Sequence, residues 1–370
     1  MSSQRTLLVA GASGLVGYAV LRHFASLPGW NVIGLSRRIP TGLEGVRIIS
    51  ADLTNRSETA EVIEQLGSVT HVVYAALYEK PDLIAGWRDP EQMQINASML
   101  ENVLSPLLES ARGLEHVTLL QGTKAYGTHI ETVPVPARER WPRHAHENFY
   151  WLQEDFLRSR QSGQDWHWTV LRPQVIFGES LGSHMNMIPA IGVYGTVLKA
   201  AGEPLHFPGG APRIFQAVDA DLLARACAWA AVTPACRNQI YNINNGEAIE
   251  WRTVWPAIAD ALGMEVGGDR PMSLAEEMPK HEDAWRRIVK EHKLAVPATL
   301  AEFVGLSFQY ADRNFNYGVT TRQPPTLVST VKARLDGFAD CVDSEEMFRR
   351  LIRRCQNRRW LPQPSQDSAR

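Results

Sequence analysis

The sequence predicts an α/β protein with a doubly wound parallel sheet and a smaller, mainly helical C-terminal lobe. Short apolar runs alternate with helical patterns from residue 6 to residue 171, as in sheets whose strands are joined by crossover helices. The first run ends in a glycine-rich turn, and no second strand–glycine–helix unit follows residue 178. We therefore expect a sheet domain at residues 1–180 and a second lobe at 181–370 that shares some strands and helices with it.

Composition and charge exclude several classes of protein. The chain has 370 residues, a hydrophobic fraction of 44% and a formal net charge of −2. A charge so close to zero argues against general binding to nucleic acids or membrane surfaces. No apolar run is long enough to cross a bilayer, and the four cysteines lack a close C-x-x-C pair. We expect a reduced, cytoplasmic protein without nucleic-acid or membrane partners, for which a homodimer is one assembly to test.

The first strand, expected at residues 6–10, runs into the turn G-A-S-G-L-V-G and a helix. Gly11 permits a tight turn, Gly14 lets the backbone approach a pyrophosphate, and Gly17 lets the helix pack on the strand. The N-terminus of the helix then presents N–H groups and a positive dipole end to phosphates. A Rossmann-type dinucleotide site is therefore predicted, and the alternative is a glycine turn without a ligand. The expected contacts are Gly11, Ser13, Gly14, Leu15, Val16 and Gly17.

The second strand, expected at residues 31–35, is followed by Ser36, Arg37 and Arg38. NAD-specific sites usually have an Asp or Glu here that binds the ribose 2′-hydroxyl, whereas guanidinium groups suit the 2′-phosphate of NADP. These residues favour NADPH as the cofactor. The alternative is a solvated pair of arginines on a surface loop.

Further candidate site residues follow the carboxyl ends of the later strands. Asp52 could bond the adenine while Leu53 packs on its ring, or Asp52 could cap the helix expected at residues 57–66. Lys124 lies just past the fifth strand, at the edge where ligands of open parallel sheets bind. The other expected cofactor contacts along this edge are Ala75, Ala76 and Gln121.

Tyr150, in the first turn of a helix expected at residues 148–162, is the candidate for the chemistry. Many short-chain dehydrogenases follow such a Tyr with a Lys four residues later, but Glu154 stands there in this chain. A nearby ammonium favours the phenolate or strengthens the hydroxyl as a donor, and Lys124 could supply that charge from the adjacent strand end. The alternative is a core tyrosine and a surface lysine.

Residues 130–145 contain three prolines and many charges, so we expect a loop that folds over the site. His144 and His146 form an H-x-H pair at its end. No third ligand is evident, so no metal site is expected.

Together the motifs resemble the family of progesterone 5β-reductase and iridoid synthase, which are atypical extended short-chain dehydrogenases. The glycine turn, S-R-R, G-T-K-A-Y, N-F-Y-W-L-Q-E-D and R-P-Q-V-I-F-G occur in the family's order, and the resemblance continues to about residue 262. The family's displaced Lys and its Tyr fall on Lys124 and Tyr150. The resemblance implies that NADPH delivers hydride to the β-carbon of an enone or enal. Tyr150 would then donate a hydrogen bond to the enolate oxygen, with Lys124 as its electrostatic partner.

The resemblance also places five residues near the nicotinamide, namely Val175, Ile176, Ser183, His184 and Met185. The chain departs from the plant members at Ala125, where they usually have His. It departs again at Ala76 and Ile130, where an aromatic pair walls their substrate pocket. The expected function is NADPH-dependent 1,4-reduction of a small-molecule enone or enal of undefined structure. The alternatives are a carbonyl reductase or epimerase on the same scaffold, and a non-catalytic NADP(H)-sensing regulatory protein.

Overall fold

The computed structural model describes residues 4–82 and 85–364 of the chain. Within it the chain forms two compact units, and each unit is assembled from three segments. The first comprises Met1–Gln174, Ala220–Asn244 and Val328–Asp340, and the second comprises Val175–Asp219, Asn245–Leu327 and Cys341–Arg370. The second half of the chain therefore returns twice to the first unit.

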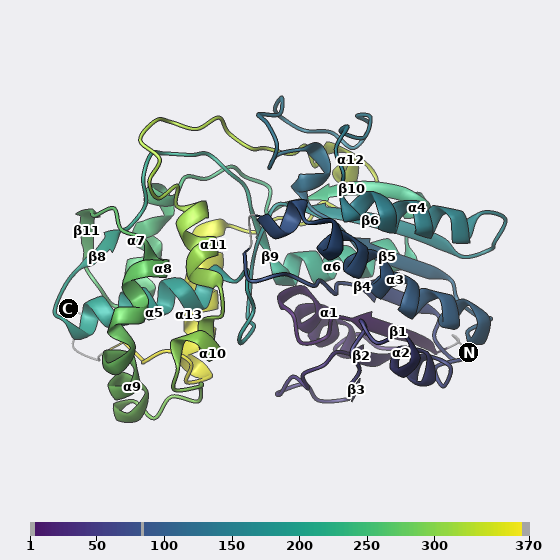
Figure 1. The fold of residues 1–370 in the computed structure, drawn as a ribbon, viewed down its shortest axis with the longest axis horizontal. Coiled ribbons are helices and arrows are strands. Elements are labelled where there is room, and N and C mark those ends of the chain that lie inside the picture. Colours follow the sequence, from purple (N-terminus) through teal and green to yellow (C-terminus); the bar gives the residue numbers. More distant parts are fainter. Residues whose placement is uncertain (1–3, 83–84, 365–370) are drawn as a thin grey trace. The chain divides into compact units, whose positions relative to one another are not determined.

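A seven-stranded sheet forms the centre of the first unit (Figure 1). Its order is β10-β6-β5-β4-β1-β2-β3, and all six neighbouring pairs are parallel. This confirms the predicted doubly wound parallel sheet. The strand order reverses at β1, so the loops after β1 and β4 diverge, which is the place where such sheets bind ligands. The strands are β1 (Arg5–Ala10), β2 (Trp30–Leu35), β3 (Val46–Ile49), β4 (His71–Tyr74), β5 (His116–Leu120), β6 (His167–Pro173) and β10 (Gln239–Ile243).

Helices cover both faces of this sheet (Figure 1). On one face α1 (Leu15–Ala25) packs against α6 (Ala220–Val232), and on the other α3 (Pro90–Ser110) lies between α2 (Arg56–Ile63) and α4 (Phe149–Gln161). Leu8 and Ala10 of β1 join the core under α2, α3 and α4. Burying a leucine side chain such as that of Leu8 contributes roughly 1.5–3 kcal/mol. The short elements of this unit are η1 (Ala85–Arg88), η2 (Thr123–Tyr126), η3 (Pro234–Cys236) and α12 (Val331–Leu335), which packs beside β10.

The second unit is mainly helical, as the sequence predicts. Its helices enclose one core in which Trp251 contacts the rings of Phe177, Phe315 and Phe348. Two short parallel sheets complete it, β7 (Val175–Phe177) with β9 (Ala217–Asp219) and β8 (Leu205–Phe207) with β11 (Val266–Asp269). The helices are α5 (Met187–Ala200), α7 (Trp251–Leu262), α8 (Leu274–Glu277), η4 (Met278–His281), α9 (Glu282–Glu291), α10 (Leu300–Val304), α11 (Ser307–Asn314) and α13 (Ser344–Asn357). Among the described residues, no helix has both the length and the apolarity that crossing a membrane requires.

Candidate functional site

The glycine turn lies at the carboxyl end of β1 and leads directly into α1. Gly11 has a φ of +87°, and a Cβ there would come within 2.7 Å of the backbone nitrogen of Ala76. A Cβ on Gly17 would lie 2.1 Å from the Gly11 carbonyl oxygen. Gly14 is the N-cap of α1, which has no side-chain N-cap hydrogen bond and no acidic residue in its first turn. The turn is thus closed against Ala75 and Ala76, and the start of α1 suits a phosphate group.

The turn after β2 is fixed by the buried hydroxyl of Ser36, which donates to the Arg38 carbonyl oxygen (2.6 Å). The side chains of Arg37 and Arg38 are both exposed. The backbone N–H of Ala51 donates to the Ser36 carbonyl oxygen, which joins this turn to the end of β3. The predicted adenosine-side residues therefore lie along one edge of the sheet.

Asp52 does not cap α2, so that alternative is wrong. Asn55 is the N-cap, and its side chain accepts from the backbone N–H of Glu58. The Oδ1 of Asp52 instead accepts from the backbone and hydroxyl of Thr54 (3.0 and 2.9 Å). Leu53 is buried, and its carbonyl oxygen accepts from Asn102 (2.9 Å). A contact of Asp52 and Leu53 with adenine stays a prediction.

Lys124 and Tyr150 are both neighbours of the Trp87 ring. The Lys124 Nζ lies 3.2 Å from the centroid of that ring, and the Tyr150 ring meets it edge-on at 5.5 Å between centroids. A Cβ on Gly122 would lie 3.2 Å from the Tyr150 hydroxyl oxygen. The structure therefore brings the two predicted catalytic residues together at the carboxyl end of β5.

Buried amides hold this pair in place. Asn148 caps α4 by accepting from the backbone N–H of Tyr150 (3.0 Å), and its Nδ2 donates to the Lys124 carbonyl oxygen (3.3 Å). Gln121 donates from Nε2 to the Tyr150 carbonyl oxygen (3.1 Å), and its Oε1 accepts from Arg172 (2.9 Å). Gln121, which the sequence predicts as a cofactor contact, thus also orients the start of α4.

Glu154, four residues after Tyr150, is the centre of an arginine cluster. Its side chain is only 2% exposed, and it contacts Arg143 (3.0 Å), Arg158 (2.9 Å) and Arg172 (3.3 Å). Burial would raise the pKa of the Glu154 carboxyl, but the three guanidinium groups outweigh burial and lower the pKa. The position that holds a lysine in ordinary short-chain dehydrogenases is structural in this chain.

Two neighbours of Lys124, Glu79 and Trp87, are missing from the sequence-based predictions. Trp87 lies in η1 and packs with Phe149, Tyr150 and Met93. Glu79 follows β4, and burial raises the pKa of its carboxyl while the Lys124 ammonium and the Trp87 indole oppose that rise. The only cue in the sequence is the Asp89–Pro90 helix start, which places the preceding segment beside α3.

The histidine pair at the end of the loop is hydrogen-bonded within the first unit. His144 Nδ1 lies 2.9 Å from His146 Nδ1, and His144 Nε2 lies 2.8 Å from Glu131. In the described ranges, no group of three or more His, Cys, Asp or Glu residues could hold a metal ion. Arg143 from the same loop binds Glu154 and Asp155, which fixes the loop to α4.

The five residues expected near the nicotinamide belong to the second unit. Val175 and Ile176 pair with Ala217 and Val218 between β7 and β9. The Ser183 carbonyl oxygen accepts from the Ser307 hydroxyl (2.7 Å). His184 is exposed and Met185 is half-buried. Their contact with a cofactor stays a prediction.

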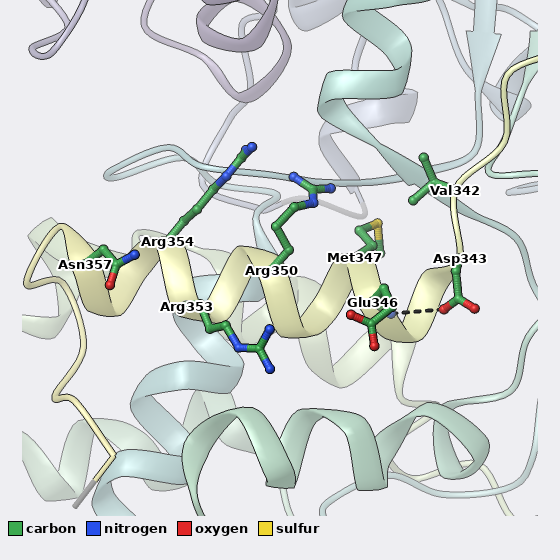
Figure 2. Close-up of a pocket in the computed structure, with 8 residues that line it drawn as sticks. All are labelled: Val342, Asp343, Glu346, Met347, Arg350, Arg353, Arg354 and Asn357. Atoms are coloured by element: carbon green, nitrogen blue, oxygen red, sulfur yellow. Dashed lines mark hydrogen bonds between the residues drawn. The ribbon is translucent and has the colours of Figure 1, made fainter. Parts of the chain in front are cut away.

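The second unit also has a pocket along α13, shown in Figure 2, that contains none of the predicted site residues. Two of its arginines have buried acidic partners, because Arg350 pairs with Asp219 and Arg354 with Glu179 (3.3 Å). The lining residues are Val342, Asp343, Glu346, Met347, Arg350, Arg353, Arg354 and Asn357. These ion pairs give the two arginines a structural role in the unit.

Comparison with known proteins gives the family. A family model described as a PRISE-like Rossmann-fold domain matches residues 40–311. The chain is 32% identical to the (S)-8-oxocitronellyl enol synthase of Catharanthus roseus, over 98% of this chain and 93% of that protein. It is 33% identical to the 3-oxo-Delta(4,5)-steroid 5-beta-reductase of Arabidopsis thaliana, over 79% of each.

Solved structures agree on the fold. The UDP-glucose 4-epimerase of Thermotoga maritima superposes with a TM-score of 0.66 at 16% identity, over 95% of this chain and 99% of that one. The UDP-glucose 4-epimerase of Thermus thermophilus, solved with NAD, gives a TM-score of 0.63 at 20% identity, over 94% of this chain and 98% of that one. At these identities the likeness concerns the fold alone.

The fold and the named relatives define a Rossmann-fold oxidoreductase of the short-chain dehydrogenase type. Within that class, the chain belongs to the PRISE-like family of progesterone 5β-reductase and iridoid synthase. The resemblance drawn from its motifs is thereby confirmed.

Proposed function

We propose that the protein uses NADPH to reduce the carbon–carbon double bond of an activated enone or enal. The observation that carries this proposal is the meeting of Lys124 and Tyr150 on the Trp87 ring. The names of the two plant relatives, an enol synthase and a Δ4,5-steroid reductase, support the same chemistry.

The residues of the first unit suit the cofactor. The closed glycine turn and the uncapped start of α1 would hold the pyrophosphate. Arg37 and Arg38 would hold the 2′-phosphate, since forked guanidinium donors match phosphate oxygens. When bound, NADPH supplies the hydride that is added to the β-carbon of the substrate.

The protein's own contribution is to stabilise the charge that develops on the substrate. As the β-carbon receives hydride, negative charge moves to the carbonyl oxygen, and a proton taken up from solvent at the α-carbon completes the reduction. The Tyr150 hydroxyl donates a hydrogen bond to that oxygen, and the Lys124 ammonium lowers the energy of the same charge. A preorganised donor of this kind is typically worth about 3 kcal/mol in the transition state. The burial of Tyr150, which is 8% exposed, excludes water that would weaken these interactions.

The test is NADPH oxidation against a panel of small enones, enals and Δ4-steroids, with deuterium-labelled NADPH. Deuterium on the β-carbon of the product supports 1,4-reduction. Deuterium on the carbonyl carbon would instead show a carbonyl reductase. Cofactor binding without consumption across the whole panel would show a sensing protein.

A variant pair sharpens this test. Tyr150→Phe should lower kcat by roughly 10²–10³-fold and leave NADPH affinity nearly unchanged, because it removes one donor to the developing charge. Tyr126→Phe is the matched control, since Tyr126 is also buried but donates to Asn242 (2.7 Å) in the interior of the unit. Full activity in Tyr150→Phe would remove Tyr150 from the mechanism.

A further inference from the structure

Asn148 joins the backbones of the two predicted catalytic residues. Its Oδ1 accepts from the Tyr150 backbone N–H (3.0 Å), and its Nδ2 donates to the Lys124 carbonyl oxygen (3.3 Å). A backbone N–H can only donate and a backbone carbonyl can only accept, so the orientation of the Asn148 amide is fixed. The amide is 4% exposed, and the second N–H of its Nδ2 therefore needs a partner inside the protein.

His146 is that partner. Its Nε2 lies 3.1 Å from the Asn148 Nδ2. Because Nδ2 donates, this ring nitrogen has to accept, and the proton of the neutral imidazole then sits on Nδ1. The His146 Nδ1 is 2.9 Å from the His144 Nδ1 and 3.3 Å from the His144 carbonyl oxygen. Both atoms can accept that proton, so the tautomer that Asn148 requires is satisfied.

The hydrogen-bond chain that starts at Asn148 ends at a carboxylate. The His144 Nε2 is 2.8 Å from the Glu131 Oε1, and an ionised carboxylate can only accept. The His144 proton therefore sits on Nε2, and the lone pair of its Nδ1 accepts from His146. The His144 ring is packed against Gly127, where a Cβ would lie 2.6 Å from its Cδ2. Gly127 directly follows η2, which carries Lys124, so this ring has a fixed place beside the site.

The two imidazoles together have places for two protons and for no third. Three hydrogen bonds join Glu131, His144, His146 and Asn148, and a histidine donates in two of them. Two neutral rings supply those two protons. A third proton would lie on the His146 Nε2, against the Asn148 N–H, or on the second Nδ1, against the proton already shared there. The Asn148 amide can regain its contact with a protonated His146 only by turning its oxygen away from the Tyr150 N–H.

We propose that His144 and His146 are positioning residues that hold the Asn148 amide in the orientation joining Tyr150 to Lys124, and that a further proton on the pair releases it. This rests on the proposed function in so far as Tyr150 and Lys124 carry out the reduction.

The direction of the pH dependence follows from the surroundings of His146. Burial, and after it the neighbouring His144, lower the pKa of the His146 imidazole from 6.5, although the carbonyl groups of His144 and Lys124 oppose this shift. The neutral ring, which the hydrogen-bond chain needs, therefore persists to a pH below 6.5. Acidification below that pH should release Asn148.

Other charged groups near the pair are held by further contacts. Arg143 binds Glu154 and Asp155 of α4, and the Lys124 Nζ lies over the Trp87 ring. The others are Arg88, which donates to the His129 carbonyl oxygen, the exposed Glu147, and His129, whose ring centroid is 5.1 Å from that of His146. Of these, only His129 is of a type that titrates in the same range, so it serves as the comparison in the experiment.

The first test measures the tautomers without any substrate. Two-bond ¹H–¹⁵N correlation spectra of the full-length protein, labelled in its histidine nitrogens, distinguish a ring protonated on Nδ1 from one protonated on Nε2. At neutral pH we expect His146 to carry its proton on Nδ1 and His144 on Nε2. His146→Gln and His144→Gln assign the two rings, and either variant suffices if the other does not fold. A proton on the His146 Nε2 at neutral pH overturns the proposal.

The second test is the pH dependence of kcat with an accepted enone, over the range in which circular dichroism shows a folded protein. Wild-type kcat should fall by up to about tenfold for each pH unit below the His146 pKa, as for one inhibitory proton. His146→Gln should lack this fall, because its amide oxygen can accept from Asn148 at any pH. His129→Gln is the matched control and should keep the fall. A fall that persists in His146→Gln overturns the role of the pair in the reaction.

A shorter amide separates positioning from titration. The amide of His146→Asn reaches only the place of Nδ1 and not Asn148. Its kcat should be roughly tenfold or more below wild type at every pH, since small displacements of positioned groups have effects of this size. Wild-type kcat in His146→Asn would contradict the proposal. A protein that shows the expected tautomers but reduces no enone would keep the hydrogen-bond chain and refute the proposed function.

Discussion

Replacing Glu154 by Gln should destabilise the first unit far more than an ordinary surface substitution. The pair of Glu154 with Arg172 is buried on both sides, with side chains 2% and 5% exposed. Removing one partner of such a pair typically costs 3–5 kcal/mol, since the other charge is left buried. Arg143 and Arg158 are 37% and 46% exposed, so solvent screening reduces each of their contributions to about 0–1 kcal/mol. Gln keeps one acceptor oxygen, so we expect a loss of about 3 kcal/mol, at the lower end of the range for a broken buried pair.

The assay is urea unfolding combined with amide hydrogen exchange. Peptides from α4 and β6 report on the first unit, and peptides from α13 report on the second as an internal reference. Asp155→Asn is the matched control, because Asp155 is 61% exposed and pairs only with Arg143 among the ion pairs of the described residues. It should cost less than about 1 kcal/mol. If Glu154→Gln costs no more than Asp155→Asn, the reasoning about the buried pair is wrong.

Three further predictions concern the first unit. Thermal stability should be greatest above pH 6.5 and fall as the pH drops towards 3. Burial lowers the pKa of His71 from 6.5 to about 4 and that of His116 to about 3, so in this range the unfolded chain binds protons that the folded chain excludes. A thermal unfolding midpoint that is independent of pH would contradict this. Gly17→Ala should abolish NADPH binding in a fluorescence titration, since the added Cβ would lie 2.1 Å from the Gly11 carbonyl oxygen. Gly113→Ala is the control and should bind NADPH normally, because a Cβ at Gly113 would meet no atom within 4 Å. Arg37→Ala with Arg38→Ala should raise the Kd for NADPH at least roughly tenfold and leave that for NADH nearly unchanged; equal losses would exclude contact with the 2′-phosphate.

The sheet could be predicted because its signals are local. The apolar runs at residues 6–10 and 31–35 predicted β1 and β2 to within one residue of the bounds that the structure shows. Helices such as α8 and α10, with 4 and 5 residues, span about one turn and carry too little periodicity to be recognised. The pairing of β10 with β6 was also beyond prediction, because parallel pairing joins distant segments.

The site residues likewise fall into some that the sequence predicts and some that it does not. Tyr150 and Lys124 stood out by their places at a helix start and a strand end, and by the family motifs around them. Glu79 and Trp87 lie in a segment without periodicity, and their positions depend on contacts with Gln92 and Asn96 from a later helix. The aromatic residue at Lys124 therefore comes from η1, a segment that no local sequence pattern predicts.

β10 is translated well after β6, the strand with which it pairs, and this has a consequence for folding during synthesis on the ribosome. β6 ends at Pro173, whereas β10 ends at Ile243, roughly 70 residues later. At about 5–20 residues per second, the backbone N–H and C=O groups on this edge of β6 stay unpaired for several seconds. An unpaired strand edge is a template for pairing with other chains. That interval is the period in which a nascent chain most needs a chaperone, and mutations that weaken β6 should first appear as poor yield of folded protein.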